Sequence, residues 1–345
     1  MRSTLLSDDV ILLLNDVSDT VRAKSIEERE KLIGQGKKAY EMIPMEDTPT
    51  KEEITFYEKA LEVSAEDTAV AVRQLAESIY ARKGQDLVLV SLIRGGLATG
   101  ILVKRYLEKK YEIKVPHYAL TLVGTKGIDK KALEYILERE EARNIQFVDG
   151  WTGKGAVSRT LEREVKDYIG LCSDLAVLSD PANIVKTSGT HEDILVASAC
   201  LNAPLSGLLS RAMPLEDSFF GAVFFEDMIE YDRTYHFIDT IERKMAYNEG
   251  KMTYEECSFD GLSEVKEIAK DFGGIDIHFI KPGVGETIRA FIRKKPDLIL
   301  IKEEKDKYTG LVRELAKQNA VKVREYPLEK YKVCGIYMDK NSDVL

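Results

Sequence analysis

Long apolar runs are missing from this chain of 345 residues. No stretch of about 18 uncharged apolar residues occurs, which argues against a helix that crosses a membrane. The N-terminal apolar run, Val10 to Leu14, follows two aspartates and lacks the basic start of a secretory signal. We therefore expect a cytoplasmic protein that is not attached to a membrane.

Cysteine is scarce, and its four copies are scattered. Cys172, Cys200, Cys257 and Cys334 show no CxxC spacing, which zinc sites and redox motifs commonly use. This pattern indicates a reducing cytoplasm and no structural zinc.

Excess positive charge is missing as well, because the net charge is −9. That balance argues against wholesale wrapping by nucleic acid but leaves a local basic face open.

The most informative stretch is Asn144 to Ala156, NIQFVDGWTGKGA. Its apolar residues Ile145 to Val148 predict a short buried strand with Asp149 at its tip. A glycine-spaced turn with Thr152 and Lys154 follows, and then a helix. Glycines let backbone N–H groups converge on phosphate oxygens, and a helix N-terminus adds its positive dipole end. The alternative is an ordinary turn whose glycines are chosen for shape.

A second unit of strand, glycine loop and helix comes earlier in the chain. Leu87 to Ile93 is a continuous apolar run, typical of a strand buried on both faces. Arg94, Gly95 and Gly96 follow it, before a predicted helix over Leu97 to Lys110. An arginine beside two glycines suits an anionic group. A surface salt bridge is the alternative for Arg94.

Strands and helices alternate through much of the chain, which indicates an α/β fold. Such folds have a parallel sheet flanked by helices and bind ligands beyond the carboxyl ends of the strands. The Arg94 loop and the Asp149 loop would then lie at one edge, with residues 180–211 as a cap. We divide the chain into residues 1–250, with a helical N-terminal region, and residues 251–345, a small α/β/α sandwich.

The helical N-terminal region contains two predicted helices. The first runs from Lys51 to Val63, where Thr50 and Glu53 form a capping box. The second runs from Thr68 to Arg82, with apolar residues at helical spacing.

The two loops together, SLIRGG (Ser91 to Gly96) and FVDGWTGKGA (Phe147 to Ala156), resemble type I phosphoribosyltransferases. The resemblance implies that fold and a Mg²⁺-assisted displacement of pyrophosphate from PRPP by a nucleobase-like acceptor. Asp149 and Arg94, with Lys126 on a lid, would be catalytic, and Mg²⁺ would be held by PRPP and by Asp149 through water. The implied PRPP-binding residues are Ser91, Arg94, Gly95, Gly96, Asp149, Thr152, Gly153, Lys154 and Gly155.

Across most of its length the chain also resembles the StiP family, phosphoribosyltransferase-like proteins of tellurite-resistance and stress gene clusters in bacteria. The resemblance runs through VPHYALTLVGTKGID, VDGWTGKGA, SDPANI, SACLNAPLSGLLSR and KPGVGETIRAFIRKKPDLIL. It implies a Pelota-like C-terminal domain related to small RNA-binding domains. The implied RNA-binding residues are Lys281, Gly283, Gly285, Glu286, Arg289 and Arg293. A solvated helix face is the alternative for the basic members of this set.

Three side chains near the two loops have open roles. Lys126 either meets phosphates on lid closure or is a solvated loop residue. His117 is expected to be packed and hydrogen-bonded. Trp151 either stacks on a base or fills an apolar gap.

Three functions compete. The first is the PRPP-dependent transferase, with RNA as a further partner and the acceptor unidentified. The second is a non-catalytic PRPP or nucleotide sensor that binds RNA, which the single acid at Asp149 favours. The third is a cysteine hydrolase, since the label of the StiP family has included cysteine protease. Cys200 would be its nucleophile, with His191 nearby in sequence, unless it is a buried inert thiol. A homo-oligomer is compatible with all three.

Overall fold

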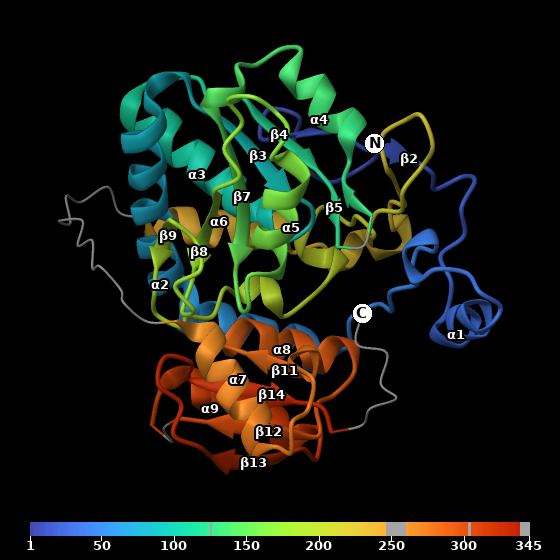
Figure 1. Cartoon of the computed structure of the whole chain (residues 1–345), viewed down its shortest axis with the longest axis vertical. Coiled ribbons are helices and arrows are strands. Elements are labelled where there is room, and N and C mark those ends of the chain that lie inside the picture. The colour runs from blue at the N-terminus through green and yellow to red at the C-terminus, as the bar shows by residue number, and fades with distance from the viewer. Residues whose placement is uncertain (125, 246–259, 303–304, 339–345) are drawn as a thin grey trace.

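The computed structural model describes the chain except for residues 125, 246–259, 303–304 and 339–345. Figure 1 shows a large α/β unit above a smaller one formed by the C-terminal part of the chain. The predicted boundary near residue 250 lies within 246–259 and so falls outside the described residues.

The larger unit is built on a parallel sheet of six strands. Their spatial order is β1 (Ile11–Leu12), β4 (His117–Leu120), β3 (Val88–Leu92), β7 (Ile145–Trp151), β8 (Leu175–Ser179) and β9 (Thr187–Thr190). Every residue of β3 is buried, as a strand covered on both faces requires. The predicted α/β fold with a parallel sheet flanked by helices is confirmed.

Helices cover both faces of this sheet (Figure 1). One face carries α2 (Lys51–Lys83), α3 (Gly96–Tyr111) and α6 (Thr234–Lys244), and the other carries α4 (Lys130–Leu137) and α5 (Ala156–Val165). Successive side chains of a strand point to opposite faces. Accordingly, Leu89 joins the apolar cluster on the first side, while Val88 and Val90 join the cluster on the second.

Short elements complete the larger unit. They are β2 (Asn15–Asp16), α1 (Ile26–Gly34), η1 (Ala39–Glu41), η2 (Gly84–Asp86), β5 (Leu122–Val123), β6 (Gly127–Ile128), η3 (Ala142–Asn144), η4 (Ala197–Ala199), η5 (Ala203–Leu205), β10 (Gly221–Ala222) and η6 (Glu226–Tyr231). Among the described residues, no helix combines the length and apolar character needed to cross a bilayer.

Helix α2 is continuous where two helices were predicted. Its start is as expected, because Thr50 and Glu53 form the capping box. No glycine or proline interrupts residues 51–83, and the small residues Ser64 and Ala65 are buried against the core at the predicted break. The helix ends at Gly84, whose φ of 73° favours glycine.

The order of the strands reverses between β3 and β7. From β3 the chain passes through α3 to β4 on one side, and from β4 it passes through α4 to β7 on the other side of β3. Such a reversal opens a crevice at the carboxyl ends of the strands. The Arg94 and Asp149 loops meet there as predicted, since a Cβ on Gly95 would lie 2.4 Å from Asp149 Oδ1. At the next residue, Gly96, a Cβ would lie 2.2 Å from the Val148 carbonyl oxygen, so only glycine fits there.

The smaller unit has a four-stranded sheet between helices. The strand order is β11 (Ile280–Pro282), β14 (Val333–Ile336), β12 (Leu298–Ile301) and β13 (Lys322–Glu325). Helices α8 (Val284–Arg293) and α9 (Lys307–Gln318) pack on one face, and α7 (Gly261–Asp271) packs on the other, with η7 (Ile277–Phe279) before β11. The apolar cluster of α8 and α9 is continuous with that of α2 and α3, so the two units share a core.

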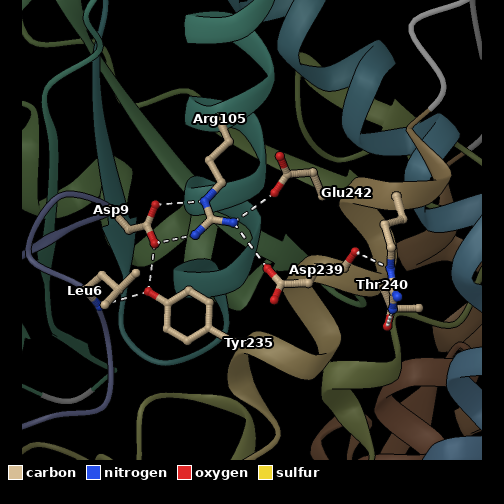
Figure 2. A network of polar contacts seen from close by, with 8 residues as sticks. Leu6, Asp9, Arg105, Tyr235, Asp239, Thr240 and Glu242 are labelled. Carbon is tan, nitrogen blue, oxygen red and sulfur yellow. Dashed lines mark hydrogen bonds and ion pairs between the residues drawn. The ribbon is translucent and has the colours of Figure 1, made fainter.

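A charged network fixes α6 against α3 and the N-terminal segment (Figure 2). Arg105 of α3 forms a bidentate pair with Asp9, with N···O distances of 2.9 and 2.8 Å. The same guanidinium reaches Glu242 at 2.8 Å and Asp239 at 3.3 Å. The Tyr235 hydroxyl donates to Asp9 Oδ2 at 2.7 Å. The network thereby sets the position of α6.

Replacing Arg105 should destabilise the protein strongly. Arg105→Ala leaves the Asp9 carboxylate largely buried without its partner, and we expect a loss of about 3 kcal/mol in the free energy of unfolding. Urea denaturation measures this loss. Arg143→Ala is the control, because the pair of Arg143 with Glu141 is exposed and should contribute less than about 1 kcal/mol. Equal losses in the two variants would contradict the role of the network.

Candidate functional site

The smaller unit covers the carboxyl edge of the large sheet (Figure 1). Trp151, at the end of β7, donates its Nε1–H to Glu286 Oε1 of α8 at 3.0 Å. A Cβ on Gly285 would lie 3.2 Å from the same indole ring, and the guanidinium carbon of Arg289 lies 5.7 Å from its centre. Two roles were considered for Trp151, stacking on a base or filling an apolar gap. The structure shows that it fills a gap, which lies between the two domains.

The glycine loop after β7 holds the C-terminal domain. Lys154 Nζ donates to the carbonyl oxygens of Ile277 and Ile280, both at 2.6 Å. The Tyr331 hydroxyl donates to the Gly153 carbonyl at 2.8 Å. Burial lowers the pKa of Lys154 to about 8. The ammonium expected to bind a phosphate is therefore engaged by backbone carbonyls.

Other residues of the two loops make contacts within the larger unit. The Ser91 hydroxyl donates to the Gly96 carbonyl at 2.8 Å and contacts His117 Nε2 at 2.7 Å. The Thr152 hydroxyl accepts from the Gly155 N–H at 3.2 Å. Burial lowers the pKa of His117 to about 4, so its imidazole is neutral at pH 7. His117 is packed and hydrogen-bonded, as predicted.

Asp193 is the main polar link between the domains. Its carboxylate accepts the Val284 N–H at 2.9 Å and the Lys332 N–H at 2.8 Å. Val284 begins α8, where the helix dipole favours a negative charge. The side chain is buried, and burial raises its pKa to about 7 against the opposing effect of these two N–H donors. Sequence reasoning missed Asp193, because its partners lie far away along the chain.

Arg94 forms a buried ion pair. Its Nη1 donates to Glu46 Oε1 at 2.6 Å and to the Leu209 carbonyl at 3.0 Å, and 6% of its side chain is exposed. The salt-bridge alternative for Arg94 is therefore correct, except that the ion pair is buried and not at the surface.

Asp149 is half-buried within β7, and burial raises its pKa to about 7. Lys126 is exposed and lies 5.1 Å from the centre of the Tyr40 ring.

A pocket lies in the crevice beside Arg94. Its cavity volume of about 10 Å³ is close to that of one water molecule. The lining residues are Arg94, Gly95, Ala98, Ser198, Leu201, Asn202, Leu205, Ser206 and Arg289. Three of them, Ser198, Leu201 and Asn202, lie within two residues of Cys200 in the chain.

Cys200 itself is buried, and burial raises the pKa of its thiol. His191, its suggested partner, instead places Nδ1 2.8 Å from the Asp180 carbonyl. In the part of the chain that the structure describes, no hydrogen bond or ion pair joins a cysteine to a histidine. A second histidine, His236, contacts a tyrosine that lies near Cys200. Tyr57, whose pKa is raised by burial and by the nearby Glu58 and Cys200, contacts His236 Nδ1 through its hydroxyl at 3.1 Å.

The predicted RNA-binding residues divide between the domain junction and the surface. Gly283 faces Asp193, and Gly285 and Glu286 contact Trp151. Arg289 is half-buried at the pocket, whereas Arg293 is exposed. The half-buried Lys281 donates to the His278 carbonyl at 2.8 Å.

Fold and site together define an α/β protein whose parallel sheet is capped, at its ligand-binding edge, by a second α/β domain. Residues 3–242 match the family described as "Tellurite-like stress resistance cysteine protease StiP", and residues 259–339 match the "PELOTA RNA binding domain". The chain is 31% identical over 312 residues to "Cysteine protease StiP" of Acinetobacter baylyi (strain ATCC 33305 / BD413 / ADP1), covering 84% of this chain and 81% of that relative. This chain belongs to the StiP family.

The predicted phosphoribosyltransferase activity is wrong, because the family and the relative are named cysteine proteases. PRPP and its nucleobase-like acceptor have no support as partners. The misleading signal was the shape of two glycine loops, whose cations Arg94 and Lys154 are engaged by Glu46 and by two carbonyls. The StiP and Pelota resemblances are confirmed. The finer likeness to the type I phosphoribosyltransferase fold and the expected Mg²⁺ stay predictions.

The raised pKa of Asp193 predicts a pH-dependent stability difference. Between about pH 4 and 7 the folded protein holds a proton on this carboxyl that the unfolded chain has lost, so the contribution of Asp193 to stability falls as pH rises. Asp193→Asn removes the titration and keeps an acceptor oxygen for one of the two N–H groups. Its stability relative to the wild type should therefore rise from pH 5 to pH 8 in urea denaturation. Asp227→Asn, at an exposed position, is the control and should show no such change.

Proposed function

We propose that this protein is a cysteine-dependent hydrolase of peptide bonds with Cys200 as its nucleophile. The printed name of the relative supports the reaction class. The region that matches the StiP family contains two cysteines, Cys172 and Cys200. Cys172 precedes β8 at the amino edge of the sheet, whereas Cys200 lies beside the pocket at the carboxyl edge. Because α/β proteins bind ligands at the carboxyl edge, this position is the observation that carries the choice of Cys200.

A base for Cys200 is available through Tyr57. The Tyr57 hydroxyl meets His236 Nδ1, and His236 Nε2 lies 3.7 Å from Glu58 Oε2. In the proposed reaction His236 accepts the thiol proton by way of Tyr57, with Glu58 orienting the imidazole. The charged network of Figure 2 includes Tyr235 and so fixes the helix that carries His236.

The covalent step follows the usual course of thiol hydrolysis. The sulfur attacks the peptide carbonyl carbon, and the C–N bond breaks as the leaving amine takes the proton held by His236. Water then attacks the thioester, which releases the acid and returns the proton to sulfur. A nucleophilic thiol needs a low pKa, whereas burial raises that of Cys200. The described conformation is therefore the resting form, and substrate binding has to expose the thiol.

Replacing Cys200 should abolish hydrolysis. We expect Cys200→Ala to lose all cleavage of a peptide library derived from a bacterial proteome, read by mass spectrometry, because no other group would form the thioester. His236→Asn should lower kcat by about 100-fold or more, as loss of a general base does. Cys172→Ala is the matched control and should cleave like the wild type. Cleavage by Cys200→Ala, or none by the wild type, would exclude this nucleophile.

RNA binding by the C-terminal domain is a second proposed function. The match of residues 259–339 to the Pelota RNA-binding domain supports it. Of the residues proposed to contact RNA, Gly283, Gly285, Glu286 and Arg289 lie at the domain junction. Arg293 is exposed and Lys281 is half-buried outside the junction, so RNA would meet these two first.

Removing those two cations should weaken RNA binding. We expect the double variant Lys281→Ala/Arg293→Ala to bind a short RNA hairpin more weakly in a filter-binding assay. The slope of log affinity against log salt should fall by about 1.4, or about 0.7 for each lost contact to a single-stranded phosphate. Arg243→Ala/Lys244→Ala removes the same charge from exposed positions of α6 and is the control. No affinity of the wild type at low salt, or an equal loss in the control, would contradict this proposal.

A further inference from the structure

The C-terminal domain closes the route to Cys200. Helix α8 packs against η4, the turn that immediately precedes Cys200. Val284 and Ile288 of α8 belong to the same apolar cluster as the buried thiol. The pocket beside this thiol has Arg289 of α8 as one wall and holds about one water molecule. A peptide is far larger than this pocket, so none can reach the thiol while α8 is docked.

A small set of polar contacts, which we call the latch, holds the C-terminal domain on the edge of the sheet. A lysine of the larger unit donates to two carbonyls of the C-terminal domain, and a neighbouring carbonyl accepts a tyrosine hydroxyl. An aspartate accepts two backbone N–H groups of that domain, and the indole donates to a glutamate. The residues whose side chains or carbonyl form the latch are Trp151, Gly153, Lys154, Asp193, Glu286 and Tyr331.

Two residues of the latch are buried ionisable groups without a counter-charge. Lys154 is bound only by carbonyl oxygens and Asp193 only by backbone N–H groups, and neither forms an ion pair among the described residues. Burial accordingly lowers the pKa of Lys154 to about 8 and raises that of Asp193 to about 7. Undocking returns both groups to water. This solvation offsets part of the hydrogen bonding and apolar contact that undocking loses, which lowers the free-energy cost of opening.

The two parts of the chain are separate modules. They match different families, over residues 3–242 and 259–339, and each has its own sheet. Domains of one chain commonly move relative to one another unless a large apolar interface joins them. Solvent-accessible ion pairs also join α9 to α2, among them Lys307 with Asp67 at 2.7 Å. Such pairs contribute little to stability, so the resistance to opening lies mainly in the latch and in the apolar residues of α8.

We propose that the C-terminal domain is an autoinhibitory lid, which keeps the thiol of Cys200 covered until the latch opens. This inference rests on the proposed nucleophilic role of Cys200 and adds the element that has to move. In the docked form the thiol is closed to peptides and to small reagents alike. Opening exposes η4 and the carboxyl edge of the large sheet, where an extended peptide has room to lie.

Alkylation of Cys200 by iodoacetamide, located by mass spectrometry, tests the lid without any assay of hydrolysis. We expect slow labelling of Cys200 in the wild type. The double variant Lys154→Met/Tyr331→Phe loses three hydrogen bonds of the latch. It should be labelled at least about tenfold faster, because each of these bonds favours the docked form. Trp151 is the only tryptophan of the chain, and its quenching by iodide should rise in parallel.

Two residues of the same types provide a matched control. Lys302 donates to the Glu329 carbonyl, and the Tyr326 hydroxyl donates to Asp271, so both bonds lie within the C-terminal domain. The variant Lys302→Met/Tyr326→Phe removes them and should label Cys200 at the rate of the wild type. Labelling as fast as in the latch variant would mean a general loosening of the domain and would overturn the lid.

A disulfide bond can hold the latch shut. A Cβ on Gly153 would lie 3.1 Å from Cγ of Glu286, which is the position that a cysteine sulfur would take there. This spacing is within the reach of a disulfide. Gly153→Cys and Glu286→Cys, added to the latch variant, should therefore restore slow labelling of Cys200 in the oxidised protein. Reduction, followed by removal of the reductant, should bring back fast labelling.

The remaining outcomes are equally decisive. Equal labelling of Cys200 in the wild type and in the latch variant would show that docking does not cover the thiol. Fast labelling of the oxidised, cross-linked protein would overturn the lid as well. If labelling follows the latch as expected but no form of the protein cleaves peptides, the lid stands and the proposed hydrolysis fails.

Discussion

The docking of α8 onto the carboxyl edge of the large sheet is the constraint on which the rest of the structure depends. It is secured by the Asp193 carboxylate, which accepts two backbone N–H groups of the C-terminal domain. A buried carboxylate is costly unless its oxygens are satisfied, and here both are. The partly exposed edge of an α/β sheet thereby becomes an internal surface, continuous with the apolar core.

This docking changes what the edge can do. The crevice at the strand reversal is normally open to ligands, but Trp151 and Lys154 bind the C-terminal domain there. What remains is a small pocket between Arg94 and Arg289, with the buried Cys200 close behind it. The proposed resting form of the thiol follows from this enclosure, because Cys200 is buried in the apolar cluster to which α8 contributes.

Much of the architecture could be predicted because its signals are local. The apolar run at Leu87 to Ile93 indicated a buried strand, and Thr50 and Glu53 marked the start of α2. The meeting of the Arg94 and Asp149 loops followed from parallel strand geometry. The function was predicted wrongly for a physical reason: glycine loops with a cation look alike whether they hold a phosphate or a neighbouring backbone. Lys154 is such a cation, and its partners lie more than 100 residues further along the chain.

Periodicity and motifs were enough to predict the strands of the sheet, the family and the presence of a Pelota domain. Which polar groups are free is a property of the folded chain. Arg94, Lys154 and Asp193 are engaged by partners distant in sequence. Burial and pairing are properties of the folded chain, because they depend on which surfaces meet, and no local pattern of residues records that.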